Sequence, residues 1–223
     1  VIHEDVINEL TQMYPLIKPL VKDDQAVIEA GFKKWAENII ANGVPHNNWN
    51  LFQADFIVKI ALVLQDNQAY ADGKGKQYYL DYIVNQNSIR QWSMNKLIAF
   101  GFDANSKTWY ESPGYSTTVL STLCDFANML DEKAGTDLFK QRPILTEAVK
   151  TSAEYLFPNR MIAGFGDTHP GYLNTGGINQ VLKYATRHKN KNLISEMNLL
   201  KNAVAPQAPI SEIEAYTSTL FYA

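Results

Sequence analysis

The chain has 223 residues, of which 46% are hydrophobic and 12% aromatic, so it is long enough to bury a substantial core. Its net charge is −3, and Lys and Arg are not gathered in runs, which argues against nucleic acid as a partner. No apolar run reaches the roughly 20 residues of a membrane-spanning helix. The single cysteine, Cys124, rules out an internal disulfide; its apolar helical surroundings predict a buried core position.

Apolar residues recur at helical spacing along most of the chain. The first expected helix contains Pro15, where we expect a kink, and the second ends at Asn42-Gly43, a common C-terminal stop. We predict helices over residues 2–20, 23–41, 50–65, 72–87, 88–100, 115–130, 137–156 (interrupted near Pro143), 174–189 and 192–204.

These helices form pairs joined by loops of unequal length, and no exact repeat is visible, which disfavours a regular repeat solenoid. We predict an all-α fold, an incomplete α/α toroid of helix hairpins over residues 1–204, with the site on long loops at one rim. Residues 205–223 differ, because the proline-containing APQAPI is followed by the β-prone YTSTLFYA. We interpret this tail as a linker and the first strand of a truncated β-sandwich domain.

Uncharged hydrogen-bonding side chains gather in the segment VPHNNWNLFQ, where the third expected helix begins. One Asn would serve as the helix N-cap, and Trp49 would pack as core. Capping alone does not account for the whole group, which comprises His46, Asn47, Asn48, Asn50 and Gln53.

A second group lies in WYESPGY, residues 109–115, where Pro-Gly makes a tight turn and sets Tyr115 at the start of a helix. Tyr115 could be an ordinary residue of an amphipathic helix. Two tyrosines, Trp109 and Glu111 also describe a sugar-binding rim, since aromatic faces stack on pyranose rings and a carboxylate accepts hydrogen bonds from hydroxyls.

A third segment, GFGDTHPGY (residues 164–172), is glycine-rich and carries Asp167 and His169. It lacks the spacing of a phosphate-binding loop, and such a segment is as often a plain turn. The four His form no HxxxH or HExxH pair, so we expect no His-based metal site. His188 follows Arg187 in a charged stretch and is expected to face solvent.

In this order, NNWN, WYESPGY and GFGD resemble the motifs of the heparinase II/III-like polysaccharide lyases, including related alginate lyases. The terminal TSTLFYA resembles the entry into that family's β-sandwich, and the resemblance covers about residues 42–223. It implies β-elimination in an anionic, uronate-containing polysaccharide, in the periplasm or after secretion. Nothing in the sequence indicates a cofactor, although some relatives hold a structural metal in the β-sandwich domain. A chain without that domain is expected to be a catalytically incomplete fragment.

β-Elimination removes the proton on the carbon beside the uronate carboxylate and expels the glycosidic oxygen from the next carbon. Hydrogen bonds to the carboxylate stabilise the developing enolate. By the resemblance, Asn48 neutralises the carboxylate with His46 beside it, and Tyr115 acts as base and then as acid. Substrate binding is assigned to Asn47, Trp49, Gln53, Trp109, Glu111 and His169.

Two other functions stay open. A glycoside hydrolase on the same toroid would use Glu111 and Asp167 as its paired carboxylates. A non-enzymatic chain would be a helical scaffold or a glycan-binding module. Because the net charge is −3, an anionic substrate would also need a local cationic groove. The candidate cations are Arg90, Arg142, Arg160 and Lys183.

Overall fold

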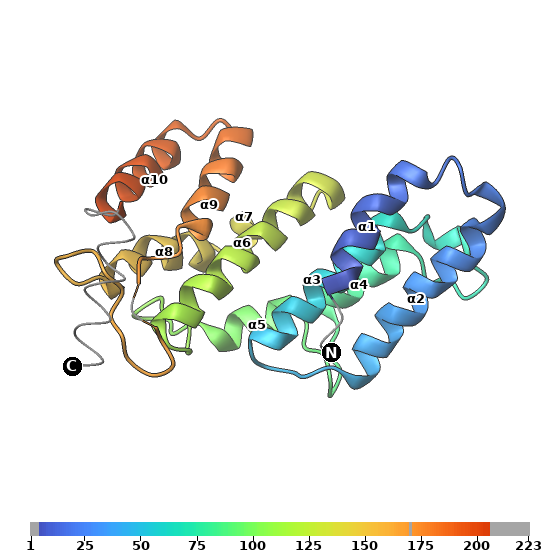
Figure 1. Ribbon diagram of the computed structural model, residues 1–223, viewed down its shortest axis with the longest axis horizontal. Coiled ribbons are helices and arrows are strands. Elements are labelled where there is room, and N and C mark those ends of the chain that lie inside the picture. The colour runs from blue at the N-terminus through green and yellow to red at the C-terminus, as the bar shows by residue number, and fades with distance from the viewer. Residues whose placement is uncertain (1–4, 170, 206–223) are drawn as a thin grey trace. The chain divides into compact units, whose positions relative to one another are not determined.

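The computed structural model describes residues 5–169 and 171–205, which form ten α-helices joined by loops and short 3₁₀ turns (Figure 1). The contacts between residues divide the chain between Gly101 and Phe102 into two compact units, called here the N-terminal unit and the C-terminal unit. The all-α prediction is confirmed for the described residues, whereas the toroid stays a prediction. The strand expected near the end of the chain lies outside the described residues.

The N-terminal unit is built around α3, which packs against the four other helices of the unit. The sequence of α3 is apolar on most of its circumference, so the helix is buried on several sides; Leu51, Ile57 and Ile60 are fully buried. The helices of this unit are α1 (Asp5–Ile17), α2 (Gln25–Asn42), α3 (Asn48–Val63), α4 (Lys76–Asn85) and α5 (Met94–Gly101).

The C-terminal unit is built around α6, which packs against α7, α8 and α9, while α10 packs against α9. Cys124 of α6 is fully buried, as predicted. The expected helix over residues 137–156 is divided near Pro143, because proline cannot donate the backbone hydrogen bond that would continue a helix. The helices here are α6 (Pro113–Ala134), α7 (Leu138–Gln141), α8 (Ile144–Thr151), α9 (Gly176–Arg187) and α10 (Lys191–Val204). Among the described residues, no helix combines the length and apolar character needed to cross a bilayer.

A buried carboxylate ties several segments of the N-terminal unit together. Glu29 of α2 is 1% exposed and accepts hydrogen bonds of 2.6 to 3.1 Å from five side chains. Burial alone would raise the pKa of Glu29, but hydrogen bonds outweigh it and lower this pKa to about 2. The ionised carboxylate therefore joins α1 and the segment after it to α2 and the loop after α3. The five donors are Tyr14, Lys18, Gln25, Gln65 and Tyr70.

Replacing Glu29 by Gln should lower the free energy of unfolding by about 3 kcal/mol at pH 7, because an amide cannot accept from all five donors. The folded pKa lies below the unfolded one, so this stabilisation is present above about pH 4.5 and is lost as the pH falls toward 2. Urea unfolding of wild type and Glu29→Gln at pH 7 and pH 3 should show a smaller difference at pH 3. Asp24→Asn, which removes an exposed acid, is the matched control; an equal difference at both pH values would contradict the role of Glu29.

Candidate functional site

The polar side chains at the start of α3 differ in their hydrogen-bond partners. Asn47 is the N-cap, and its Oδ1 accepts the N–H of Trp49 at 3.0 Å. Gln53 is 1% exposed, and its Oε1 accepts the N–H of Val44 at 3.0 Å. Asn48, the half-buried first residue of α3, makes no side-chain hydrogen bond to any described residue. Asn48 is therefore the amide of this group that stays available to a ligand, while Asn47 and Gln53 support the local backbone.

The fully buried Asn50, to which the sequence assigned no separate role, holds a distant segment against α3. Its Oδ1 accepts the N–H of Trp92 at 2.8 Å, and its Nδ2 donates to the carbonyl oxygen of Trp92 at 3.1 Å. The Nε2 of Gln91 donates in turn to the carbonyl oxygen of Asn50 at 3.1 Å. We call this set of contacts the Asn50 clamp; it fixes the backbone of Trp92 beside the start of α3.

Gly43 and His46 adapt to the close approach of the clamped segment. A Cβ on Gly43 would lie 2.6 Å from the Oε1 of Gln53 and 2.8 Å from the carbonyl oxygen of Arg90, so only glycine fits. His46 has a φ of 54°, in the left-handed region, and its ring lies 4.9 Å from the indole of Trp92 between centroids. Because positive φ is costly for a residue with a side chain, this geometry is maintained by its surroundings.

In the C-terminal unit, the WYESPGY segment and the GFGDTHPGY loop contact each other. The Oγ1 of Thr168 accepts the N–H of Gly114 at 2.9 Å, which joins the GFGDTHPGY loop to the first turn of α6. Gly166 has a φ of 61°, and a Cβ there would lie 3.1 Å from the Cβ of Ser112. The sequence predicted both segments but not their contact. Tyr115, next to Gly114 on α6, is 41% exposed.

Trp109 and Glu111 are joined by a hydrogen bond. Glu111 is partly exposed, whereas Trp109 is buried. Trp109 is 2% exposed, and its Nε1 donates to the Oε2 of Glu111 at 2.7 Å. The buried indole of Trp109 thus positions Glu111 and does not offer an open face to a sugar, and the substrate-binding role of Trp109 stays a prediction. Tyr110 is 47% exposed; partial burial and the charge of Glu111 raise the pKa of Tyr110 to about 12, so Tyr110 stays protonated near neutral pH.

Two buried side-chain atoms have no hydrogen-bond partner within the described part of the chain. One is the Oε1 of Gln91, in the Asn50 clamp, and the other is the Oγ of Ser112, in WYESPGY. An unsatisfied buried polar atom costs about 1–3 kcal/mol, and such costs are often met at functional sites. Each candidate region thus contains an unsatisfied buried polar atom, and this feature is independent of the sequence motifs.

The predicted site residues divide between the two units. The N-terminal unit contains His46, Asn47, Asn48, Trp49 and Gln53. Trp49 is 43% exposed and His46 is also exposed. The C-terminal unit contains Trp109, Glu111, Tyr115 and His169, of which His169 is exposed.

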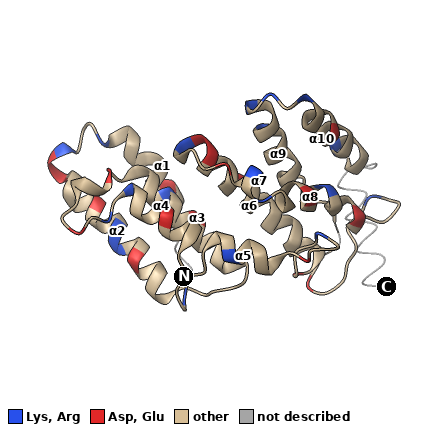
Figure 2. Cartoon of the chain, turned by 180° about the vertical axis from the view of Figure 1, so that it is seen from behind, with Lys and Arg blue, Asp and Glu red and all other residues tan. Residues whose placement is uncertain are grey.

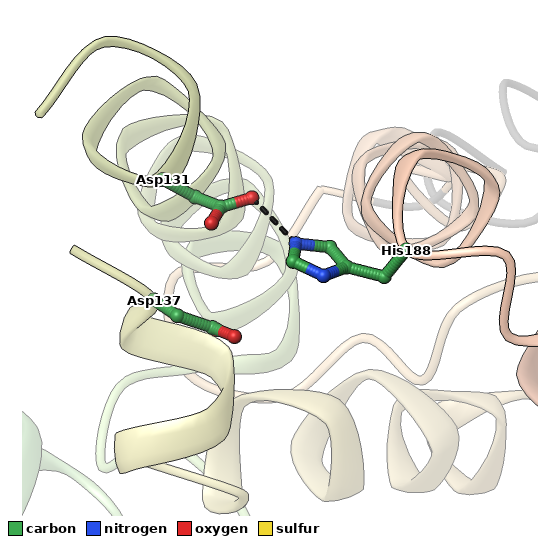
Figure 3. Close-up of side chains that lie close together, drawn as sticks. All are labelled: Asp131, Asp137 and His188. Atoms are coloured by element: carbon green, nitrogen blue, oxygen red, sulfur yellow. Dashed lines mark hydrogen bonds and ion pairs between the residues drawn. The ribbon is translucent and has the colours of Figure 1, made fainter. Parts of the chain in front are cut away.

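One group of side chains has the spacing of a metal site. Asp131, Asp137 and His188 place their ligand atoms within 4.8 Å of one another (Figure 3). The Nε of Arg187 lies 2.8 Å from the Oδ2 of Asp131, and the Nε2 of His188 lies 2.8 Å from the same oxygen. Burial opposes the ionisation of Asp131, but hydrogen bonds from His188 and Arg187 outweigh it and lower the pKa of Asp131. This arrangement is explained as an ion-pair network between α6 and the end of α9. His188 is exposed, as expected, but it is also paired.

Some of the expected cations are engaged within the C-terminal unit. The Nη1 of Arg160 donates to the carbonyl oxygen of Ala205 at 2.7 Å, and the Nζ of Lys183 lies 3.7 Å from Glu132. In the N-terminal unit, positive and negative side chains alternate along α2 (Figure 2). A groove of about 880 Å³ runs beside α2 around Glu29. Its lining contains four lysines and four acids, and none of the predicted site residues, so it is separate from them.

Replacing Asn50 by Ala should lower the free energy of unfolding by about 2–4 kcal/mol, because the backbone N–H and carbonyl of Trp92 lose their side-chain partner. Asn48→Ala, two residues away, removes no hydrogen bond and should change stability by less than about 0.5 kcal/mol. Urea unfolding of the two variants measures the difference. Equal losses for both would contradict the division of roles at the start of α3.

Replacing Thr168 by Val should release the GFGDTHPGY loop from α6, because valine keeps the shape of the side chain but cannot accept from Gly114. We expect a loss of about 1 kcal/mol in stability and faster amide hydrogen exchange at Gly114. Thr122→Val is the control, since the Thr122 hydroxyl contacts only its own helix. Unchanged exchange at Gly114 in Thr168→Val would show that this contact does not hold the loop.

Comparison with known proteins gives one family match. Residues 105–214 match the family model described as the second domain of an endo-acting ulvan lyase. The matched range includes all of WYESPGY (residues 109–115) and all of GFGDTHPGY (residues 164–172). Searches of curated proteins and of solved structures gave no match. The family match supports the polysaccharide lyase part of the resemblance, without singling out the heparinase II/III-like group.

Proposed function

We propose that this chain is part of a polysaccharide lyase that cleaves an acidic, uronate-containing polysaccharide of the ulvan type by β-elimination. The observation that carries the proposal is the match of residues 105–214 to the second domain of an endo-acting ulvan lyase. A polymeric substrate of this kind also favours a periplasmic or secreted protein.

Asn48 is proposed to neutralise the uronate carboxylate. Its amide has no partner among the described residues, whereas the neighbouring Asn47, Asn50 and Gln53 are all bonded to the protein. An amide N–H that donates to the carboxylate stabilises the negative charge that moves onto it as the proton on the adjacent carbon leaves. The exposed ring of Trp49 follows Asn48 and suits the apolar face of a sugar.

Tyr115 is proposed as the base and then the acid. In its deprotonated form the phenolic oxygen takes the proton from the carbon beside the carboxylate, and that C–H electron pair becomes the new C=C bond. The bond from the next carbon to the glycosidic oxygen breaks, and this oxygen leaves with the proton that Tyr115 returns. Tyr115 is open to solvent on the first turn of α6, so a sugar can reach it.

Glu111 argues against the hydrolase alternative. Its Oε2 accepts the indole N–H of Trp109 at 2.7 Å, so this carboxylate oxygen is already bonded within the protein and is not directed at a leaving sugar. Asp167, the other carboxylate of that alternative, is exposed on the GFGDTHPGY loop. A positioning role for Glu111 at the rim fits these contacts better than general acid catalysis.

Replacing Tyr115 by Phe, or Asn48 by Ala, should lower the rate of product formation at least about 100-fold, because proton transfer or enolate stabilisation is lost. The measurement is the ultraviolet absorbance of the unsaturated uronate that is formed from ulvan. The assay is run with this chain and with any natural protein that contains it. Glu111→Gln should keep most of the activity. Full activity in Tyr115→Phe together with no activity in Glu111→Gln would overturn the proposed lyase in favour of a hydrolase.

A further inference from the structure

Lys96 of α5 is held in a defined place without an acidic partner. Its Nζ lies 3.7 Å from the centroid of the Trp92 ring, a cation–π contact. Lys18, Lys33, Lys59 and Lys74 of the same unit all have carboxylate partners within 3.0 Å, whereas Lys96 has none among the described residues. Its positive charge is therefore localised but not neutralised.

The indole of Trp92 brings several binding groups together. Its Nε1 has no acceptor in the described part of the chain, although an indole N–H usually finds one when it is buried. The ring of Phe100 meets the indole edge-on at 5.2 Å between centroids and is 56% exposed. The ring of His46, which precedes the start of α3, lies against the same indole.

The Asn50 clamp explains why these groups stay in place. It fixes the Trp92 backbone through two hydrogen bonds, and the Oγ of Ser93 then accepts the N–H of Lys96 at 3.2 Å as α5 begins. The ammonium, the indole N–H and the exposed phenyl ring are thus presented by a short, anchored stretch of chain. Preorganised groups of this kind lose little entropy when a ligand binds.

We propose that Lys96, Trp92 and Phe100 form a subsite for an acidic sugar residue, adjoining His46. The Lys96 ammonium and the indole N–H of Trp92 donate to an anionic group, a carboxylate or a sulfate ester, and Phe100 contacts the apolar face of the pyranose ring. This subsite rests on the proposed function for its substrate class. It adds the local positive charge that a chain of net charge −3 needs for an anionic polysaccharide.

The test is the affinity of the folded chain for acidic oligosaccharides prepared from ulvan, measured by isothermal titration calorimetry. Lys96→Gln should weaken binding roughly tenfold, because a charge-assisted hydrogen bond is lost, and the effect should shrink in high salt. Lys34→Gln is the matched control, since it removes another exposed positive charge from the same unit, on α2. Trp92→Phe, which keeps an aromatic ring but removes the N–H, should weaken binding as well.

Carboxyl-reduced and desulfated forms of the same oligosaccharides identify the anionic group, because the effect of Lys96→Gln should disappear with the form that lacks it. Equal affinity of wild type and Lys96→Gln would overturn the subsite and leave the proposed lyase standing. Selective weakening in Lys96→Gln without any unsaturated product would support the subsite and count against the lyase. No binding by the folded wild-type chain, or the same loss in Lys34→Gln, would overturn the subsite.

Discussion

The pair of hydrogen bonds between the Asn50 side chain and the backbone of Trp92 is the constraint on which the candidate site of the N-terminal unit depends. A buried amide must be satisfied, and here it is satisfied by a segment 42 residues further along the chain. Through this contact, the start of α3 and the start of α5 share one corner of the unit. The ring of Trp92 in turn contacts the His46 ring and the Lys96 ammonium.

In each unit, segments that are distant in the sequence are held together, but by different side chains. In the N-terminal unit, side-chain amides and a glycine without room for a Cβ bring the segments together. In the C-terminal unit, a threonine hydroxyl and two glycines join the GFGDTHPGY loop to α6. Each region also contains one buried polar atom that has no partner in the described part of the chain, and this cost fits regions shaped for binding more than for stability.

The helices could be predicted from the sequence because their apolar periodicity is local. The boundary errors also have local causes: α4 begins at Lys76 because a 3₁₀ turn and loop precede it, and α6 begins two residues early because Pro113 suits a first helical turn. The division into two units was not predicted, since it depends on contacts between helices.

The site could be predicted in part. Asn47 as a cap follows from local rules, and the two loops of the C-terminal unit were identified by composition. Trp92 and Lys96 were missed because their importance comes from long-range contacts. One signal was present: Asn50 shares the buried face of α3 with Ala54 and Ile57, and an amide on such a face requires a partner elsewhere in the chain.

The proposed reaction is β-elimination and not hydrolysis. Mass spectrometry of the products from a single, defined acidic oligosaccharide tests it most directly. Elimination adds nothing to the substrate, so the masses of the two products should sum to the mass of the substrate. A sum greater by the mass of one water molecule would show hydrolysis and rule out β-elimination.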